Sequence, residues 1–531
     1  MPIHEQTVSQ HLRELVIRRQ EGVLTRRGFL KAATAMGLSV PLMTMLDQHG
    51  LAALQDAEAT GELGIVLQRV LVSLDPHGPQ SVEEPTAVIA SHIFGTLITR
   101  NFDTGELEPS LATSWEPVDE TTWQFTLREG VMWQNDTPFT SADVKASLDR
   151  VLELGGPLAP LWALVTAVEA PDDLTVTITT SEPQGTVPVS ATLFFITPAG
   201  LSAEEGFFDA PVGIGPYQFS TWDRDSQIVL EASSTYWGES AAVQTLTFRE
   251  IPEVAARATA IETGEIDFTY GLPADQLPAL RENSDLSIAS TPSYAYYFTW
   301  FNSSREPFTD ARVRQAMNYA LDLDTLAGDL LQDVGAVATA PIPPTIFGHA
   351  PQTPYGYDPE RARSLLAEAG LEDGFDTHVI WVPGSGPQDR ELVLSFVSYW
   401  SEIGVNVESR EMEQAAWLED LLALNWDMDF QTNTVRTGDA DFTLRRLYTT
   451  AANRNGYGNP ELDEILIGAA AASDPAEREA LYADACRIIW DDAVGVFPFD
   501  LLANYVLNNR IQGFEAVPNT IPIFSNVTLA E

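Results

Sequence analysis

The chain has 531 residues, of which 76 are acidic and 29 are basic, so its formal net charge is −47. This length is too great for one hydrophobic core, and two or three structural lobes are therefore expected. A negative field of this size repels nucleic acids and anionic membrane surfaces, which excludes both as expected partners.

The first 59 residues have the three parts of an export signal. Residues 25–31 read Thr-Arg-Arg-Gly-Phe-Leu-Lys, the pattern of twin-arginine export. The uncharged stretch 32–46 is too short to cross a bilayer but suits the apolar part of a signal peptide. Ala57 and Ala59 flank a small-x-small cleavage site, which predicts a mature chain that begins near Thr60.

The mature chain begins with strand patterns. Residues 122–127 and 175–179 alternate in polarity, which predicts two half-buried strands. Residues 139–151 open with a Thr/Ser cap and continue with helical spacing. No apolar run approaches 18 residues and no cysteine stands beside the apolar part of the leader, so we expect a soluble periplasmic protein without a lipid anchor.

Helical patterns dominate from residue 310 onward. Helices are predicted over 310–321, over 358–370 and from residue 474, each beginning with an aspartate cap. Strands predicted at 378–381 and 405–408 lie between helices, which favours a mixed α/β lobe. The only cysteine, Cys486, lies in a stretch of helical spacing and is expected to be a buried apolar residue.

Short motifs follow one another along the whole mature chain. In order they are Leu74-Asp-Pro-His77, Ile93-Phe-Gly-Thr-Leu97, Leu107-Glu-Pro-Ser-Leu-Ala-Thr-Ser-Trp115, Trp123-Gln-Phe-Thr-Leu-Arg-Glu-Gly-Val131, Pro138-Phe-Thr-Ser-Ala-Asp-Val144, Val212-Gly-Ile-Gly-Pro-Tyr217, Tyr236-Trp237, Gly264-Glu-Ile-Asp267 and Pro307-Phe-Thr-Asp-Ala-Arg-Val-Arg-Gln-Ala316. No single motif is decisive, but the ordered set resembles the peptide/nickel family (family 5) of ABC-importer solute-binding proteins, and its dipeptide, oligopeptide and glutathione-binding members in particular.

The resemblance implies an α/β fold of the periplasmic-binding-protein kind, two-lobed, type II and cluster C-like, with an extra inserted lobe. The lobes it implies are a ligand-binding lobe I from 60–100, 200–294 and 500–531, an inserted lobe over 101–199, and a ligand-binding lobe II over 295–499. The ligand is expected in the cleft between the two binding lobes, which close around it by a hinge motion.

The resemblance also implies the function of a substrate-binding subunit of an ABC importer. We expect a monomer, exported by the twin-arginine translocase, that delivers a peptide-like solute to the ABC permease and ATPase subunits. No enzyme activity, cofactor or metal is expected. Peptide-binding members pair the ligand backbone with a strand-like segment, which here corresponds to residues 429–441, and strand addition suits a peptide ligand.

One position in this segment departs from the family pattern. Three residues before Asp439, peptide-binding members commonly have an aspartate that receives the ligand's α-ammonium, and this chain has Arg436. A guanidinium favours a carboxylate, so one hypothesis is that Arg436 holds an acidic group of the ligand. The alternative is that Arg436 points away and pairs with Asp439 or Asp441.

Two further stretches, 437–448 and 473–490, look like those of glutathione-binding members, so a glutathione-like, carboxylate-bearing ligand is a leading possibility. The aromatic run 294–300 alternates, but the pattern does not decide which parity faces the cleft. The ligand-binding candidates are Tyr294, Tyr296, Trp417, Asn433, Thr434, Val435, Arg436 and Asp439.

Rival functions have weaker support in the sequence. A sugar, an opine-like compound, a metal complex or another cation remains an alternative ligand, and the same lobes also serve receptors that signal to a membrane sensor. A secreted hydrolase is the alternative of another class. The four histidines of the mature chain, His77, His92, His349 and His378, have no metal-ligand spacing, and no nucleophile elbow, P-loop or dinucleotide fingerprint is present.

Overall fold

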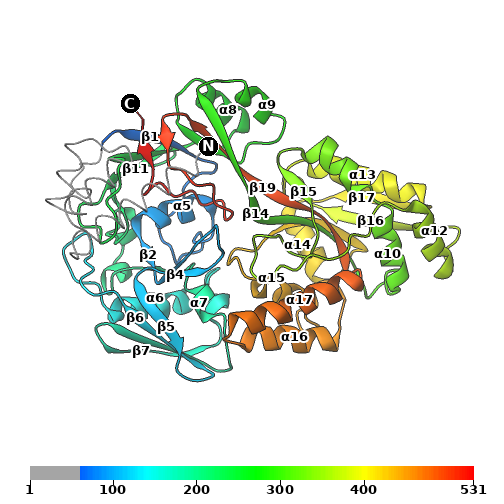
Figure 1. Ribbon diagram of the computed structural model, residues 1–531, viewed down its shortest axis with the longest axis horizontal. Helices are drawn as coiled ribbons and strands as arrows, with labels where there is room; N and C mark the ends of the chain where they lie inside the picture. The colour runs from blue at the N-terminus through cyan, green and yellow to red at the C-terminus, as the bar shows by residue number, and fades with distance from the viewer. Residues whose placement is uncertain (1–59, 531) are drawn as a thin grey trace, which may run out of the picture.

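The computed structural model describes residues 60–530 (Figure 1). The predicted leader, its twin arginine and the cleavage site before Thr60 lie outside the described residues. Within residues 60–530, no helix is both long and apolar enough to cross a membrane.

One large mixed sheet organises most of the chain. Its eleven strands are β10 (Tyr217–Asp223), β11 (Gln227–Ala232), β12 (Thr245–Glu250), β1 (Glu62–Leu67), β13 (Phe268–Tyr270), β19 (Gly495–Asn508), β14 (Leu286–Phe301), β18 (Met428–Thr434), β16 (Phe375–Trp381) and β17 (Val405–Glu411) in spatial order, with β15 (Gly335–Val337) paired to β19. The pairs β1–β12, β1–β13, β16–β17 and β16–β18 are parallel and the others are antiparallel. This mixture, with helices beside it, confirms the α/β fold class.

Two long antiparallel strands join the two halves of this sheet. We call the half with β10, β11, β12, β1 and β13 lobe I, and the half with β18, β16 and β17 lobe II. Strand β14 pairs along its length with β19, and both run from lobe I into lobe II (Figure 1). The lobe boundaries expected at 294/295 and 499/500 therefore fall inside β14 and β19, at the crossing between the lobes.

The inserted part has a small sheet and a core of its own. The sheet order is β5 (Ala112–Pro117), β6 (Thr122–Leu127), β8 (Thr175–Thr180) and β7 (Val165–Asp172), and helix α6 (Ser141–Leu154) packs beside it. The strands predicted at 122–127 and 175–179 and the helix predicted at 139–151 are confirmed. Thr140 and Asp143 form a capping box, which satisfies the free N–H groups at the start of α6.

Lobe II carries most of the helices. They are α10 (Ala311–Tyr319), α12 (Pro359–Glu368), α13 (Asp389–Glu402), α14 (Gln414–Leu422), α15 (Asp441–Tyr448), α16 (Pro460–Ala471) and α17 (Pro475–Asp491). The predicted helices at 310–321, at 358–370 and from 474 correspond to α10, α12 and α17. Each begins after an aspartate whose side chain accepts a backbone N–H bond: Asp310, Asp358 and Asp474.

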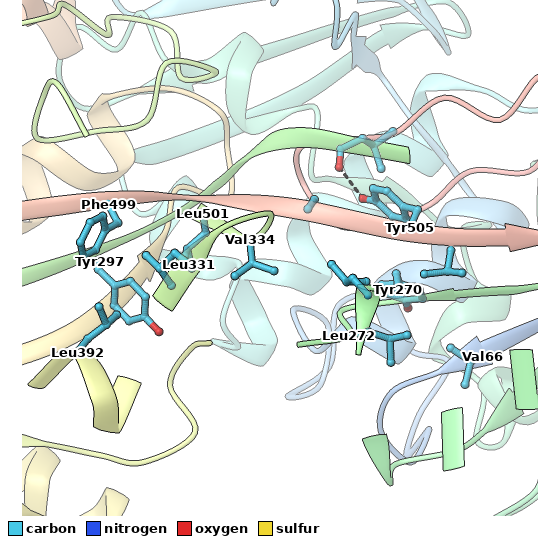
Figure 2. Packing of buried hydrophobic residues seen from close by; sticks show 14 of the residues in the cluster. Val66, Tyr270, Leu272, Tyr297, Leu331, Val334, Leu392, Phe499, Leu501 and Tyr505 are labelled. Atoms are coloured by element: carbon cyan, nitrogen blue, oxygen red, sulfur yellow. Dashed lines mark hydrogen bonds between the residues drawn. The ribbon is translucent and has the colours of Figure 1, made fainter. Parts of the chain in front are cut away.

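The hydrophobic core is continuous across the lobe crossing. In Figure 2, Val66, Tyr270 and Leu272 lie on the lobe I side with Tyr505 beside them, and Tyr297, Leu392 and Phe499 lie toward lobe II. Leu331, Val334 and Leu501 lie between the two groups. A second cluster fills lobe II beneath α15, α16 and α17, and fully buried Cys486 belongs to it, as predicted. The shared core ties the two lobes together along β14 and β19.

Candidate functional site

A cavity of about 590 Å³ lies where the two lobes and the insert meet. Gln68, Arg69, Glu83 and Glu84 line it from lobe I, and Tyr294, Thr434, Arg436 and Thr437 line it from the side of lobe II. Arg100 and Phe102 complete the wall next to the insert. The volume lies in the range of pockets that enclose most of a small organic ligand.

Arg436 crosses from one lobe to the other in this cavity. It follows β18, and its Nη1 donates a hydrogen bond of 2.8 Å to the carbonyl oxygen of Val82, in the loop before helix α5 (Glu84–Ile93) of lobe I. Burial lowers the pKa of Arg436, and the nearby carboxylate of Glu83 acts in the opposite direction. A guanidinium with one backbone bond still has several N–H donors for an acidic ligand group.

The alternative interpretation of Arg436, an ion pair with Asp439 or Asp441, is wrong. Asp439 pairs with Arg478 at 2.8 Å, and both side chains are almost fully buried. Asp441 pairs with Arg445, also at 2.8 Å. Both carboxylates thus have their own arginine partner inside lobe II, away from the cavity.

A second arginine, Arg100, lies against the same loop. It ends strand β3 (Ile98–Arg100), and it donates through Nη1 to Gly105 O at 2.6 Å and through Nη2 to Thr437 O at 3.1 Å. Gly438, with φ +66°, makes this approach feasible, because a Cβ there would lie 2.7 Å from the hydroxyl of Tyr294 and 3.1 Å from Nε of Arg100. Within residues 60–530 neither Arg100 nor Arg436 forms an ion pair, although most other arginines do.

Three of the eight predicted ligand-binding residues line the cavity: Tyr294, Thr434 and Arg436. The other five do not. Asn433 bonds Thr443 and Arg446, Val435 is fully buried, and Asp439 is in the buried ion pair just described. Tyr296 is fully buried in lobe II, and Trp417 donates to Asp429 at 2.8 Å. For these five the structure shows scaffold contacts, and their ligand-binding role stays a prediction.

Strand geometry explains this division. Successive side chains of a strand point to opposite faces, so at the end of β18 Thr434 lines the cavity while Asn433 bonds within lobe II. Arg436 lies beyond β18 in a turn, where its backbone N–H donates to Thr434 O at 3.0 Å, and this turn places Arg436 at the cavity. Tyr294 and Tyr296 share a parity, but the pairing of β14 with β19 shifts register between Pro292 and Tyr296, so only Tyr294 reaches the cavity.

The sequence analysis missed the lobe I wall. Glu84 lies at the start of α5, and its Oε1 accepts a hydrogen bond from the hydroxyl of Tyr270. Its Oε2 is buried and has no hydrogen-bond partner among the described residues. Burial raises the pKa of Glu84 to about 7. The Pro that follows Glu84 marks a helix start in the sequence, but no local signal shows that this start meets a cavity.

Comparison with known proteins relates the whole fold to one family. The family model described as bacterial extracellular solute-binding proteins, family 5 middle, matches residues 106–455. The glutathione-binding protein GsiB of Pectobacterium atrosepticum is 30% identical over 495 residues, covering 88% of this chain and 94% of that protein. GsiB of Escherichia coli strain K12 is 29% identical over 412 residues, covering 73% of this chain and 79% of that protein.

Solved structures share the fold. HbpA2 of Haemophilus parasuis superposes with a TM-score of 0.80 at 23% identity, covering 89% of this chain and all of that chain. A dipeptide-binding protein from Pseudoalteromonas sp. SM9913, in complex with Met-Leu, superposes with a TM-score of 0.72 at 25% identity, covering 88% of this chain and all of that chain. These likenesses extend over both lobes and the insert.

Proposed function

Since the chain belongs to the bacterial extracellular solute-binding proteins of family 5, we propose that it is the periplasmic substrate-binding subunit of an ABC importer for a carboxylate-bearing, peptide-like solute. The observation that carries this proposal is the pair Arg436 and Arg100, two arginines in the cavity between the lobes that have no ion-pair partner among residues 60–530. In a chain with a net charge of −47, carboxylates are abundant partners, so two arginines left without one mark a place for an external anion.

The likeness to glutathione-binding relatives supports a glutathione-like ligand. Glutathione carries carboxylate groups, which suit a cavity lined by the guanidinium groups of Arg436 and Arg100. Arg436 and Arg100 also make reciprocal contacts: Arg436 reaches from lobe II to Val82, and Arg100 reaches back to Thr437. An anion held between them therefore stabilises the approach of the two walls, as hinge closure requires.

The same proposal includes the route to the periplasm and the partners. The chain is exported through the twin-arginine translocase, carries no lipid anchor, and acts as a monomer with ABC permease and ATPase subunits. The twin arginine at Arg26 and Arg27 supports the export route. Arg26→Lys with Arg27→Lys should abolish periplasmic delivery, and undiminished delivery would contradict this route.

Thermal-shift measurements on the purified protein test the ligand class. Glutathione and small acidic peptides should raise the melting temperature, because a ligand at a hundred times its Kd stabilises the folded state by about 2.7 kcal/mol. Neutral sugars should leave it unchanged. A melting temperature that rises only with a sugar or a metal salt, and with no carboxylate-bearing solute, would overturn the proposal.

A further inference from the structure

Glu84 is an unusual carboxylate within the cavity. It lines the lobe I wall, and one of its oxygens accepts a hydrogen bond from Tyr270, while the buried Oε2 has no hydrogen-bond partner among residues 60–530. Burying a carboxylate oxygen without a partner is unfavourable, and proteins avoid it unless the group has a cation, a metal or a proton to bind. The placement of Glu84 therefore calls for a partner that the scaffold does not supply.

The nearby arginines do not fill this role. Arg69 is in an ion pair with Glu83 at 3.0 Å, and Arg257 donates to the carbonyl oxygens of Ile251 and Pro252. Burial raises the pKa of Glu84 to about 7 and outweighs the hydrogen bond from Tyr270, the charges of Arg69 and Arg257, and the backbone of Gln68, all of which favour its charged form. Near neutral pH the carboxyl group of Glu84 can therefore lose its proton when a cation binds beside it.

The cavity offers cationic side chains for an anionic ligand group and a carboxyl group for a cationic one. Arg436 and Arg100 lie together at the loop after β18, where Arg100 donates to Thr437 O. Glu84 accepts a hydrogen bond from Tyr270, and the charges that act on its carboxylate are those of Arg69 and Arg257, not those of Arg436 and Arg100. A ligand that satisfies both the arginines and Glu84 carries an anionic and a cationic group on one small molecule.

We propose that Glu84 receives the ammonium group of a zwitterionic ligand whose carboxylate is held by Arg436 and Arg100. This inference rests on the proposed function and adds the direction of the ligand: the amino group points toward α5 and Tyr270, and the carboxylate points toward the loop after β18. An ammonium donates to Oε2, which gives the buried oxygen its missing partner and forms a charge-assisted hydrogen bond.

The test compares ligands with and without the amino charge on matched variants. Isothermal titration calorimetry at pH 7.5 would measure glutathione, N-acetylglutathione, trialanine and N-acetyltrialanine against the unchanged chain, Glu84→Gln and the control Glu262→Gln, on the exposed side of α8 (Val254–Glu262). Acetylation removes the ammonium and keeps every carboxylate. The unchanged chain should bind the acetylated forms roughly tenfold to a hundredfold more weakly, the range for losing a hydrogen bond to a charged group.

Glu84→Gln should weaken the free-amine ligands by a similar factor and leave the acetylated ligands unchanged, while Glu262→Gln alters none of them. Equal loss for free and acetylated ligands in Glu84→Gln, or no effect of acetylation on the unchanged chain, overturns the assignment of Glu84 and leaves the proposed function intact. Failure of the unchanged chain to bind either free-amine ligand overturns both. The acetylation comparison needs no substitution, so equal affinity of the unchanged chain for free and acetylated ligands overturns the assignment even if Glu84→Gln does not fold.

Discussion

Asp439 and Arg436 are close in sequence, in the loop after β18, but the protein treats their charges in opposite ways. Asp439 is matched by Arg478 at 2.8 Å inside lobe II, where both side chains are almost fully buried. Arg436 forms no ion pair with the described carboxylates and donates to a backbone oxygen of the other lobe. Paired buried charges belong to the scaffold, because removing one partner leaves the other as an uncompensated buried charge. A charge in a cavity without such a pair is available to a ligand.

Breaking the matched pair should have the largest effect, and that effect should be on stability. Arg478→Ala leaves Asp439 as a buried charge without a partner, and the loss of one member of such a pair costs about 3–5 kcal/mol. Urea denaturation followed by circular dichroism measures it. Arg487→Ala, an exposed arginine on α17, is the control and should cost less than about 1 kcal/mol. Equal costs for the two variants would contradict the scaffold role of Asp439 and Arg478.

Removing the unmatched charge should instead affect binding. Arg436→Ala should weaken glutathione or an acidic peptide by about 1.5–3 kcal/mol, or roughly tenfold or more, because a hydrogen bond to a charged group is lost. Its free energy of unfolding should change by less than that of Arg478→Ala. Calorimetry measures the affinity and denaturation measures the free energy of unfolding, and both are done on the same preparation. Unchanged affinity would show that Arg436 only joins the lobes through Val82.

Arg100 should matter less than Arg436. Two of its N–H groups are already used on Gly105 O and Thr437 O, so fewer remain for the ligand. Arg100→Ala is expected to cost about 1 kcal/mol of binding, and Arg100→Lys should restore only part of it, because an ammonium cannot make the planar contacts of a guanidinium. A larger loss of ligand affinity in Arg100→Ala than in Arg436→Ala would contradict the prediction that Arg436 contributes more to binding.

The smallest expected effect concerns Glu84 and pH. Its pKa of about 7 in the folded chain exceeds its ordinary value because of burial, so the stability it contributes is full at low pH and is lost as the pH rises through 7. As the pH rises from 6 to 7.5, the difference in unfolding free energy between Glu84→Gln and the unchanged chain should therefore shift by about 1 kcal/mol in favour of Glu84→Gln.

Denaturation of both proteins at the two pH values measures this gain. Other buried groups also titrate: burial lowers the pKa values of His77 and His92 to about 4 and raises those of Asp429 and Asp500 to about 7. Both proteins contain these groups, so their contributions cancel in the difference between the two proteins. Burial raises the pKa of Tyr270, which donates to Glu84, well above its ordinary value, so Tyr270 keeps its proton in this range. A constant difference between the two proteins would contradict a raised pKa at Glu84.

The helices and strands were predictable wherever a local pattern decides them. Strands β6 and β8 follow the alternation of 122–127 and 175–179, and α10, α12 and α17 begin at aspartates that accept backbone N–H bonds. The site was only partly predictable. The resemblance identified the segment with Arg436, but it also gave Asp439 a ligand-binding role, and the structure places Asp439 in an ion pair with Arg478.

What the sequence determined by itself is the acidic charge, the order of strands and helices, the family and an arginine at position 436. What only the tertiary structure decided is which of these residues meet. Arg100 and Thr437 are 337 positions apart, and Glu84 and Tyr270 are 186 positions apart, so no local pattern relates them. The crossing of β14 and β19 brings these walls together, and burial at that place, a property of the packed chain, gives Glu84 and Arg436 their chemistry.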